Sequence, residues 1–271
     1  MTQIIFIPSK VRDDQIEVFI WRNLSMINVQ GKTVREIALE MPVTTRVFEE
    51  FKIDYCCHGN TPFDEACRNV GASPDVVQTK IDSVLDVSAG PDRNSFSGMD
   101  LSDLIEHILE KHHVYTKAEM EQLTPLMAKV ASRHCDHNPY LLELKELFQE
   151  LCYDLEPHMT KEEMVLFPYI EKLEYNHTNQ LHAAFPPFGT VQHPVSMMNI
   201  EHEQVGEILE KMREVTNDYA LPPEACPSFT ALYHRLGEFE RDIHQHIHLE
   251  NNLLFPRAVE MENEVFSSVV H

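Results

Sequence analysis

The sequence predicts an all-α protein in which a four-helix bundle follows a small helical domain. The strongest observation is a duplication: the string His-x-x-x-Glu-x-x-x-Leu-Phe-Pro occurs at residues 158–168 and again at residues 246–256. Apolar residues around both copies recur at helical spacing. Only 8 glycines occur in 271 residues, which is typical of a chain with long helices and few tight turns.

The segments can be placed in order along the chain. Residues 1–26 are an N-terminal extension to which the sequence assigns no role, and residues 27–85 are a small helical domain. Within that domain, residues 33–54 predict two short helices that meet at Met41-Pro42, because proline suits the first position of a helix. Residues 86–99 are rich in turn-forming residues and predict a linker to the bundle at residues 100–263.

Four long helices are expected in the bundle, at residues 100–132, 138–173, 194–218 and 227–262. Asp100 marks the first start, and Asn138, His193 and Cys226 mark the others, each directly before a proline. One residue conflicts with this assignment: Pro157 lies inside the second helix, where it removes a backbone hydrogen bond. We expect either a kink there or a helix that restarts at Pro157.

Each duplicated segment places a histidine and a glutamate on what should be the buried face of its helix. Four residues apart, His158 and Glu162 project from one side, as do His246 and Glu250. The apolar positions around the first copy are Leu151, Leu155, Val165, Leu166 and Tyr169, and those around the second are Phe239, Ile243, Leu253 and Leu254. A lone ionised carboxylate in an apolar interior is very unfavourable unless it is paired or bound to a metal, so the two segments predict a shared cation.

The duplication extends upstream to two more histidines. His113 precedes His158 by 45 residues, and His202 precedes His246 by 44. The residues that share a helical face with them are Leu109 and Met120 for His113, and Val195, Met198, Val205 and Leu209 for His202. We therefore expect two helical hairpins whose histidines point into one core.

The predicted metal site consists of His113, His158, Glu162, His202, His246 and Glu250. Four imidazoles and two carboxylates exceed the ligand set of one tetrahedral zinc ion; they suit two ions bridged by both carboxylates, with open positions for a small ligand. Nitrogen and oxygen ligands without thiolate favour non-haem iron over manganese or zinc. His112 is an alternative to His113, whereas His248, about 200° around the helix from His246, and His244 should face away from the site.

At these residues the chain resembles the di-iron iron–sulfur cluster repair proteins (the RIC family), whose C-terminal half is a hemerythrin-like four-helix bundle. The resemblance rests on residues 106–113, 158–168, 201–203 and 246–257, and on residues 222–226 between the last two helices. It implies that the same six residues bind two iron ions, bridged by both glutamates and by an oxo group.

A second match lies in the N-terminal domain, where residues 54–57 resemble that family's Asp-Tyr-Cys-Cys motif. Cys56 and Cys57 are expected not to bond to each other, because adjacent cysteines close a strained ring. We assign them a catalytic role in handling metal or redox equivalents; the alternative is a pair of ordinary reduced cysteines at a helix end. His58 stands where glycine is usual in the family, and we interpret it as a solvated loop residue rather than a further nitrogen ligand.

Composition argues against several other classes. The formal charge of −22, from 44 acidic and 22 basic residues, opposes binding to nucleic acid. No apolar run approaches the roughly 20 residues that cross a bilayer, and residues 4–7 lack the basic leader of a secretory signal. We therefore expect a cytoplasmic protein with no membrane partner, whose six cysteines are reduced.

Three functions are compatible with these features. The resemblance implies a homodimer that restores iron–sulfur clusters damaged by nitrosative or oxidative stress, supplying iron to the damaged proteins rather than acting as an enzyme. The alternative is a di-iron enzyme that binds nitric oxide or oxygen and reduces nitric oxide or turns over peroxide. A gas or iron sensor is the third, although a pure binding module would not need the extra thiol-containing domain.

Overall fold

The computed structural model describes residues 29, 31–87, 96–181 and 186–267. The expected extension at residues 1–26 and most of the expected linker at residues 86–99 lie outside the described residues. The described chain forms two compact units. One contains the residues up to Ile53 and those from Asn60 to Val87, and the other contains Asp54–Gly59 and the residues from 96 on. Both units are helical, and the all-α fold class is confirmed.

The first unit consists of short helices: α2 (Val34–Glu40), the 3₁₀ turn η1 (Pro42–Thr44), α3 (Thr45–Phe51), α4 (Phe63–Asn69) and α5 (Pro74–Val87). The predicted junction at Met41-Pro42 is confirmed, because α2 ends just before it and η1 starts at the proline. A reciprocal cap starts α2: the Glu36 N–H donates to Thr33 Oγ1 (3.2 Å), and the Thr33 N–H donates to Glu36 Oε2 (2.8 Å). The buried core of this unit includes Ile37 and Phe48.

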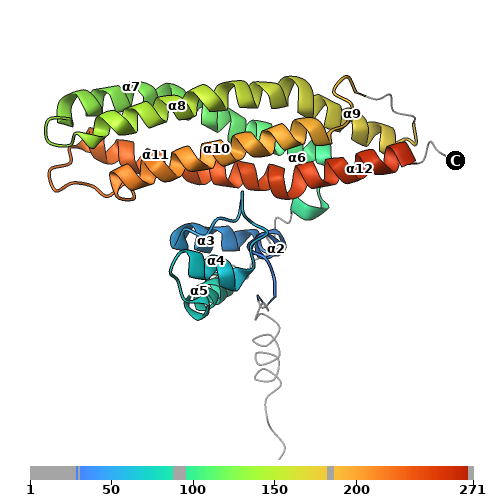
Figure 1. Ribbon diagram of the computed structural model, residues 1–271, viewed down its shortest axis with the longest axis horizontal. Coiled ribbons are helices and arrows are strands. Elements are labelled where there is room, and N and C mark those ends of the chain that lie inside the picture. The colour runs from blue at the N-terminus through green and yellow to red at the C-terminus, as the bar shows by residue number, and fades with distance from the viewer. Residues whose placement is uncertain (1–28, 30, 88–95, 182–185, 268–271) are drawn as a thin grey trace, which may run out of the picture. The chain divides into compact units, whose positions relative to one another are not determined.

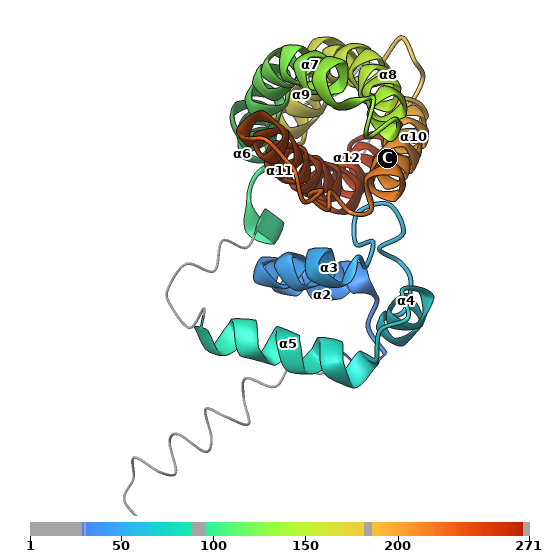
Figure 2. The same ribbon diagram turned by 90° about the vertical axis from the view of Figure 1, so that its left-hand side faces the viewer.

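The second unit is a four-helix bundle whose long helices are rows of shorter ones. The first row is α6 (Leu101–His107), η3 (Ile108–His113) and α7 (Val114–His134), and the second is α8 (Tyr140–Lys161), η4 (Glu162–Leu166) and α9 (Phe167–Thr178). The third is α10 (Gln192–Thr216), and the fourth is α11 (Pro227–Leu249), η5 (Glu250–Leu254) and α12 (Phe255–Ser267). The four rows run side by side in Figure 1, and Figure 2 shows them end-on around one axis. They agree with the four predicted helices to within a few residues.

The interior of the bundle is apolar along most of its length. α8 packs against α7 and α10, and α11 packs against α7. The four rows all contribute to this core, for example through Leu123, Phe148, Leu209 and Phe239. Each such side chain contributes about 1.5–3 kcal/mol when it is fully buried. The apolar contacts therefore hold the rows in a fixed register around the polar residues that they enclose.

Three of the rows are interrupted by a π-helical turn close to the duplicated residues. The turn η3 ends at His113, η4 starts at Glu162 and η5 starts at Glu250. A π turn adds a residue to an α-helix and is frequent at functional sites. Because the regular helical spacing did not include these turns, the expectation that Val165 is buried is wrong, since this residue is 49% exposed. Leu166 is buried as expected, and the next residue, Phe167, is buried as well.

Two local expectations about helix starts have different outcomes: a restart at Pro157 is excluded, whereas the start at Asp100 is confirmed. α8 continues through Pro157 up to the π turn η4, so the helix does not restart at the proline. The alternative, a kink at Pro157, stays a prediction. Asp100 is the N-cap of α6, but its side chain makes no capping bond. Glu174 of α9 replaces it, accepting from the N–H groups of Leu101 (2.6 Å) and Ser102 (2.8 Å).

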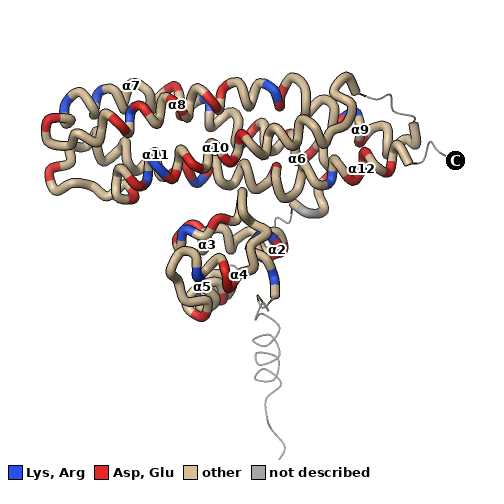
Figure 3. The backbone as a smooth tube through the Cα atoms, in the orientation of Figure 1, with Lys and Arg blue, Asp and Glu red and all other residues tan. Residues whose placement is uncertain are grey.

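The charged surface of the bundle is mainly acidic. Asp and Glu outnumber Lys and Arg along its helices in Figure 3, in keeping with the formal charge of −22. Among the helices that the structure describes, none combines the length and the apolar character needed to span a bilayer.

Candidate metal centre

The bundle brings all six predicted metal ligands into one buried cluster. They are His113 of η3, His158 of α8, Glu162 of η4, His202 of α10, His246 of α11 and Glu250 of η5. Both glutamates are 0% exposed, and each histidine is at most 2% exposed. Every row of the bundle contributes at least one of them, so the cluster depends on the packing of all four.

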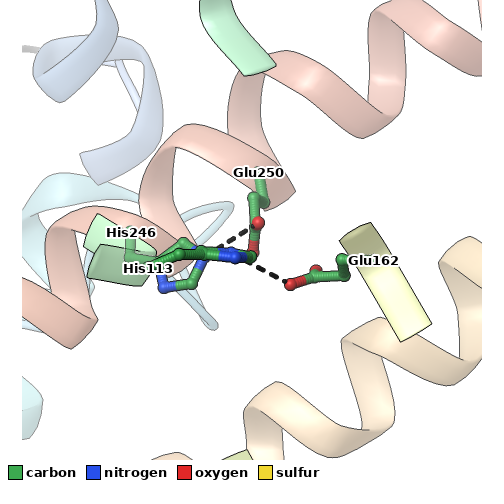
Figure 4. Close-up of side chains that lie close together, drawn as sticks. All are labelled: His113, Glu162, His246 and Glu250. Carbon is green, nitrogen blue, oxygen red and sulfur yellow. Dashed lines mark hydrogen bonds and ion pairs between the residues drawn. The ribbon is translucent and has the colours of Figure 1, made fainter. Parts of the chain in front are cut away.

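The six residues divide into two sets of four that share both glutamates. One set is His113, His246, Glu162 and Glu250, and the other is His158, His202, Glu162 and Glu250. The ligand atoms of each set lie within 4.8 Å of one another. Figure 4 shows the first set, with both carboxyl groups directed toward the two imidazoles. This arrangement fits two metal positions with carboxylates between them.

In each set the two imidazoles approach through their Nε2 atoms. The distance is 3.1 Å between His113 and His246 and 3.1 Å between His158 and His202. Two nitrogen ligands at about 2.1 Å from one ion and at right angles to each other lie about 3.0 Å apart. The spacing of 3.1 Å is therefore compatible with two nitrogen ligands on one ion, and in the metal-free cluster it is that of a hydrogen bond between the two rings.

The carboxylate oxygens provide a second test of whether a metal fits. The two oxygens of Glu162 lie 3.4 Å from the Nε2 atoms of His113 and His158, yet neither accepts a hydrogen bond. Glu250 Oε2 lies 3.2 Å from His202 Nε2 and also accepts none. Buried carboxylate oxygens without donors are very unfavourable, and a cation among these groups removes that penalty. The residues present therefore fit a metal ion in each set.

The charges of the side chains in the metal-free cluster also favour a positive ion between them. Burial opposes ionisation of both glutamates, but the imidazoles around them outweigh it: the pKa of Glu162 is lowered, and that of Glu250 lies well below its ordinary value. Burial alone would lower the pKa of His158, but the charge of Glu162 raises it to about 10. At His246 burial prevails and lowers the pKa. Ionised carboxylates thus face at least one imidazolium, whose positive charge a metal ion replaces.

Hydrogen bonds at the outer nitrogen fix the rings of three of the four histidines. The Nδ1 pairs are His113 with Glu163 (2.7 Å), His158 with Glu201 (2.8 Å) and His202 with Asn251 (2.8 Å). With Nδ1 donating, each ring presents its unprotonated Nε2 to a metal. The bond from His158 is also the main cause that lowers the pKa of Glu201 to about 2.

These three hydrogen-bond partners were not predicted from the sequence, although the sequence contains a signal for them. Glu163 and Asn251 directly follow the two shared glutamates, and Glu201 directly precedes His202. The two copies of the duplicated segment differ at the residue that follows the glutamate, which is Glu163 in the first copy and Asn251 in the second. The duplicated string alone cannot show this difference, because the position lies among its unspecified residues.

His112, the alternative to His113, takes a different role. Its Nδ1 lies 3.0 Å from Asp242 Oδ1, and its ring stacks on the ring of His246 with centroids 5.7 Å apart. His112 therefore packs against a residue of the first set, while His113 belongs to that set.

Two further histidines lie outside both sets. His248 is buried, with Nδ1 2.9 Å from Asn252 Nδ2, and its ring meets the ring of Tyr55 edge-on at 5.2 Å. His244 Nε2 lies 3.9 Å from Glu240 Oε1. Both positions follow from their angle around the helix relative to His246.

The segment Asp54–Gly59, which belongs to the same unit as the bundle, forms a tight loop around the Asp54 carboxylate. Oδ1 accepts from the N–H groups of Cys56 (3.0 Å) and Cys57 (2.9 Å), and Oδ2 accepts from the N–H of His58 (3.2 Å) and from its Nδ1 (2.6 Å). Both cysteines are free, with their Sγ atoms 3.7 Å apart. The side chain of His58 is 72% exposed, so it lies in solvent while it holds the carboxylate.

The Cys56 thiol is not an activated nucleophile. Its hydrogen bond with Cys57 and its burial raise its pKa well above the ordinary value. A reactive cysteine needs the opposite shift. Cys56 therefore suits metal binding, in which the ion itself displaces the thiol proton, better than nucleophilic chemistry.

Two asparagines of η5 attach this loop to the bundle. Asn251 Nδ2 donates to the Cys56 carbonyl (3.3 Å), and Asn252 Nδ2 donates to the preceding loop carbonyl (3.0 Å). The Cys57 Sγ lies 3.8 Å from the His202 carbonyl oxygen. Since the Asn251 Oδ1 accepts from His202, this one amide connects a histidine of the second set with the cysteine loop.

Loading the metal-free protein with Fe²⁺ under anaerobic conditions is expected to release protons. With a pKa of about 10, His158 is protonated at neutral pH and must lose that proton to bind an ion. The apparent metal affinity should therefore rise with pH across the neutral range. Calorimetric titration in two buffers of different ionisation enthalpy measures the protons released per chain. His158→Ala should release fewer, and a count of zero for the unaltered chain would contradict the assignment.

Two family models match the chain. The Hemerythrin HHE cation binding domain matches residues 104–258, and a Domain of Unknown function (DUF542) matches residues 30–85. The first match includes all six clustered residues. The bundle and its buried histidine–glutamate cluster thus define a hemerythrin-type cation-binding fold.

Curated relatives extend the likeness over most of the chain. The iron-sulfur cluster repair protein ScdA of Staphylococcus haemolyticus is 31% identical over 227 residues, which cover 82% of this chain and 95% of the relative. The iron-sulfur cluster repair protein YtfE of Cronobacter sakazakii is 32% identical over 225 residues, covering 83% and 94%. A probable iron-sulfur cluster repair protein of Haemophilus influenzae is 27% identical over 224 residues, covering 83% and 95%. The chain belongs to this family of iron–sulfur cluster repair proteins, as its motifs predicted.

Proposed function

We propose that this chain binds two iron ions in the buried cluster and supplies iron to iron–sulfur proteins whose clusters have been damaged by nitrosative or oxidative stress. The observation that carries the proposal is the pair of ligand sets that share Glu162 and Glu250. In this assignment each ion takes two imidazoles, and both carboxylates bridge the two ions. The relatives named as repair proteins support the reaction.

The ligand chemistry supports iron and its release. Imidazole and carboxylate groups without thiolate suit non-haem iron. Each ion has four protein ligands, two of which it shares with the other ion, so a six-coordinate ion retains open positions. Iron held in this way should leave more readily than iron enclosed by four thiolates. A labile centre is suited to donating metal.

Iron transfer is the direct test. An enzyme that has lost activity through nitric oxide damage to its four-iron cluster is incubated anaerobically with the chain loaded with isotopically labelled iron, in the presence of a reductant. We expect activity to return and the label to appear in the rebuilt cluster. The metal-free chain and an equal amount of free Fe²⁺ are the controls. Recovery no better than with free Fe²⁺ would overturn the proposal.

A nitric-oxide-reducing enzyme is the second candidate, and the open positions expected on each ion favour it. The two functions differ in what happens to the metal. An enzyme consumes nitric oxide over many turnovers at constant iron content, whereas a donor loses iron as the client cluster is rebuilt. Nitric oxide consumption and bound iron, measured on the same sample, separate them.

Changing both Cys56 and Cys57 to serine is expected to leave the absorption spectrum and iron content of the buried centre unchanged but to slow repair to the rate obtained with free Fe²⁺. The thiols lie outside the two ligand sets, next to the backbone of His202. Cys135→Ser is the matched control, since that cysteine is also free and half-buried. Unchanged repair by the double variant would remove the cysteine pair from the mechanism.

A further inference from the structure

The loop Asp54–Gly59 presents a third group of metal-binding side chains, separate from the two sets that share the glutamates. Asp54, Cys56 and Cys57 each offer a ligand atom within 4.8 Å of the others. In an extended chain, neighbouring side chains point in opposite directions. Here the N–H groups of both cysteines donate to Asp54 Oδ1, Cys56 Sγ lies 3.4 Å from that oxygen, and Cys57 Sγ lies within 4.8 Å of the carboxylate.

The distances within this group match those of a tetrahedral ion. Two sulfur ligands at about 2.3 Å from one ion lie about 3.8 Å apart, and a sulfur and an oxygen ligand lie about 3.6 Å apart. The Sγ atoms of Cys56 and Cys57 are 3.7 Å apart, and Cys56 Sγ is 3.4 Å from Asp54 Oδ1. A disulfide would require about 2.05 Å between the sulfurs. The two thiols are therefore reduced and in contact, at a separation that one ion could bridge without a large movement of either side chain.

The ligand types narrow the choice of ion. Two thiolates and one carboxylate select borderline transition metals such as Zn²⁺ or Fe²⁺ over Mg²⁺ or Ca²⁺, which take oxygen ligands. His58 holds the carboxylate at Oδ2, while Oδ1, which accepts the two cysteine N–H groups, lies 3.4 Å from Cys56 Sγ. With three protein ligands, the fourth position of a tetrahedral ion stays open, as in sites that exchange a ligand.

We propose that Asp54, Cys56 and Cys57 form a third, exchangeable site for a divalent transition-metal ion, in which the ion replaces the two thiol protons and these pass to solvent. Asp54 and Cys57 are partly exposed, which gives the ion access, while Cys56 is buried. The contacts of Cys57 with the His202 carbonyl and of Asn251 with both His202 and Cys56 place this site against the ligands of the second set. A role of this site in passing iron to a damaged protein rests on the proposed function. The binding of an ion at the site does not depend on that function.

The test adds Co²⁺ to the full-length chain whose buried centre is already loaded with iron, and measures cobalt and iron per chain in the same sample. We expect one cobalt ion in addition to the two irons, thiolate-to-cobalt charge-transfer absorption in the near ultraviolet, and protection of two of the six cysteines from a thiol reagent. Changing both Cys56 and Cys57 to serine should abolish all three signals, and Asp54→Asn should weaken cobalt binding by about 10–100-fold. Cys135→Ser should change none of them.

Two results would overturn the proposal: cobalt uptake without thiolate absorption, or the same uptake by the Cys56 and Cys57 double variant. Thiol protection in the unaltered chain needs no variant, so it decides the question even where a variant folds poorly. The outcome is independent of repair. If cobalt binds through thiolates but the chain repairs no cluster, the third site is supported and the proposed function is refuted. If the chain repairs clusters but binds no cobalt through thiolates, the proposed function is supported and the third site is refuted.

Discussion

Replacing Glu162 or Glu250 by alanine is expected to reduce the metal content from two ions per chain to one or none, while most of the helical content survives. Each glutamate belongs to both ligand sets, so its loss removes a ligand from both ions. The helices do not depend on these carboxylates, because buried apolar residues continue along the bundle on both sides of them, for example Phe148 on one side and Ile170 on the other. Metal analysis and circular dichroism on the purified variants measure the two effects.

Glu262→Gln is the matched control for these variants. Glu262 is also a buried glutamate of the bundle, at 5% exposure, but it accepts the N–H of Val191 (2.9 Å) and belongs to neither set. We expect the glutamine variant to keep both ions even if its stability falls. Full retention of two ions by both alanine variants would refute the bridging roles of Glu162 and Glu250.

Removing the metal from the unaltered protein is expected to lower the free energy of unfolding by about 3 kcal/mol or more, since a ligand at 100 times its Kd contributes about 2.7 kcal/mol. For a protein of this size, that loss corresponds to a fall of about 6–12 °C in Tm. The physical cause is the burial of two neighbouring carboxylates. Burial and the negative charge of Glu250 oppose the ionisation of Glu162, and once the ions are gone only the histidines, which lower the pKa of Glu162, offset these effects. Thermal unfolding with and without a chelator gives the difference.

The variant with alanine at both Glu162 and Glu250 serves as the control for the chelator. It lacks the shared ligands and the repulsion between them, so the chelator should leave its Tm almost unchanged. If the unaltered protein also melts at the same temperature with and without chelator, the ions do not bind at a site formed by folding.

The fold class and the clustered residues could be predicted because the controlling signals are local and repeated. The four-residue spacing of His158 and Glu162 recurs in His246 and Glu250, and the helical period alone assigns all four to inner faces. His113 could be preferred over His112 only through the expected match between the two hairpins. The structure places His113 in the cluster and pairs His112 with Asp242.

The π turns and the outer hydrogen bonds could not be predicted in this way. A π turn changes which residues face inward, as the exposure of Val165 shows, and the regular helical period does not indicate where one will form. The bond from His113 to Glu163 joins residues 50 positions apart. No periodicity within a single helix contains that information.

The sequence by itself determined the helical fold, the duplicated ligand string and the adjacent cysteines, because each depends on spacing within one segment of chain. The tertiary structure decided that both glutamates serve both sets, and that one amide, Asn251, joins a clustered histidine to the cysteine loop. These relations depend on distances between atoms from separate helices. Only the packing of the four rows against one another fixes those distances.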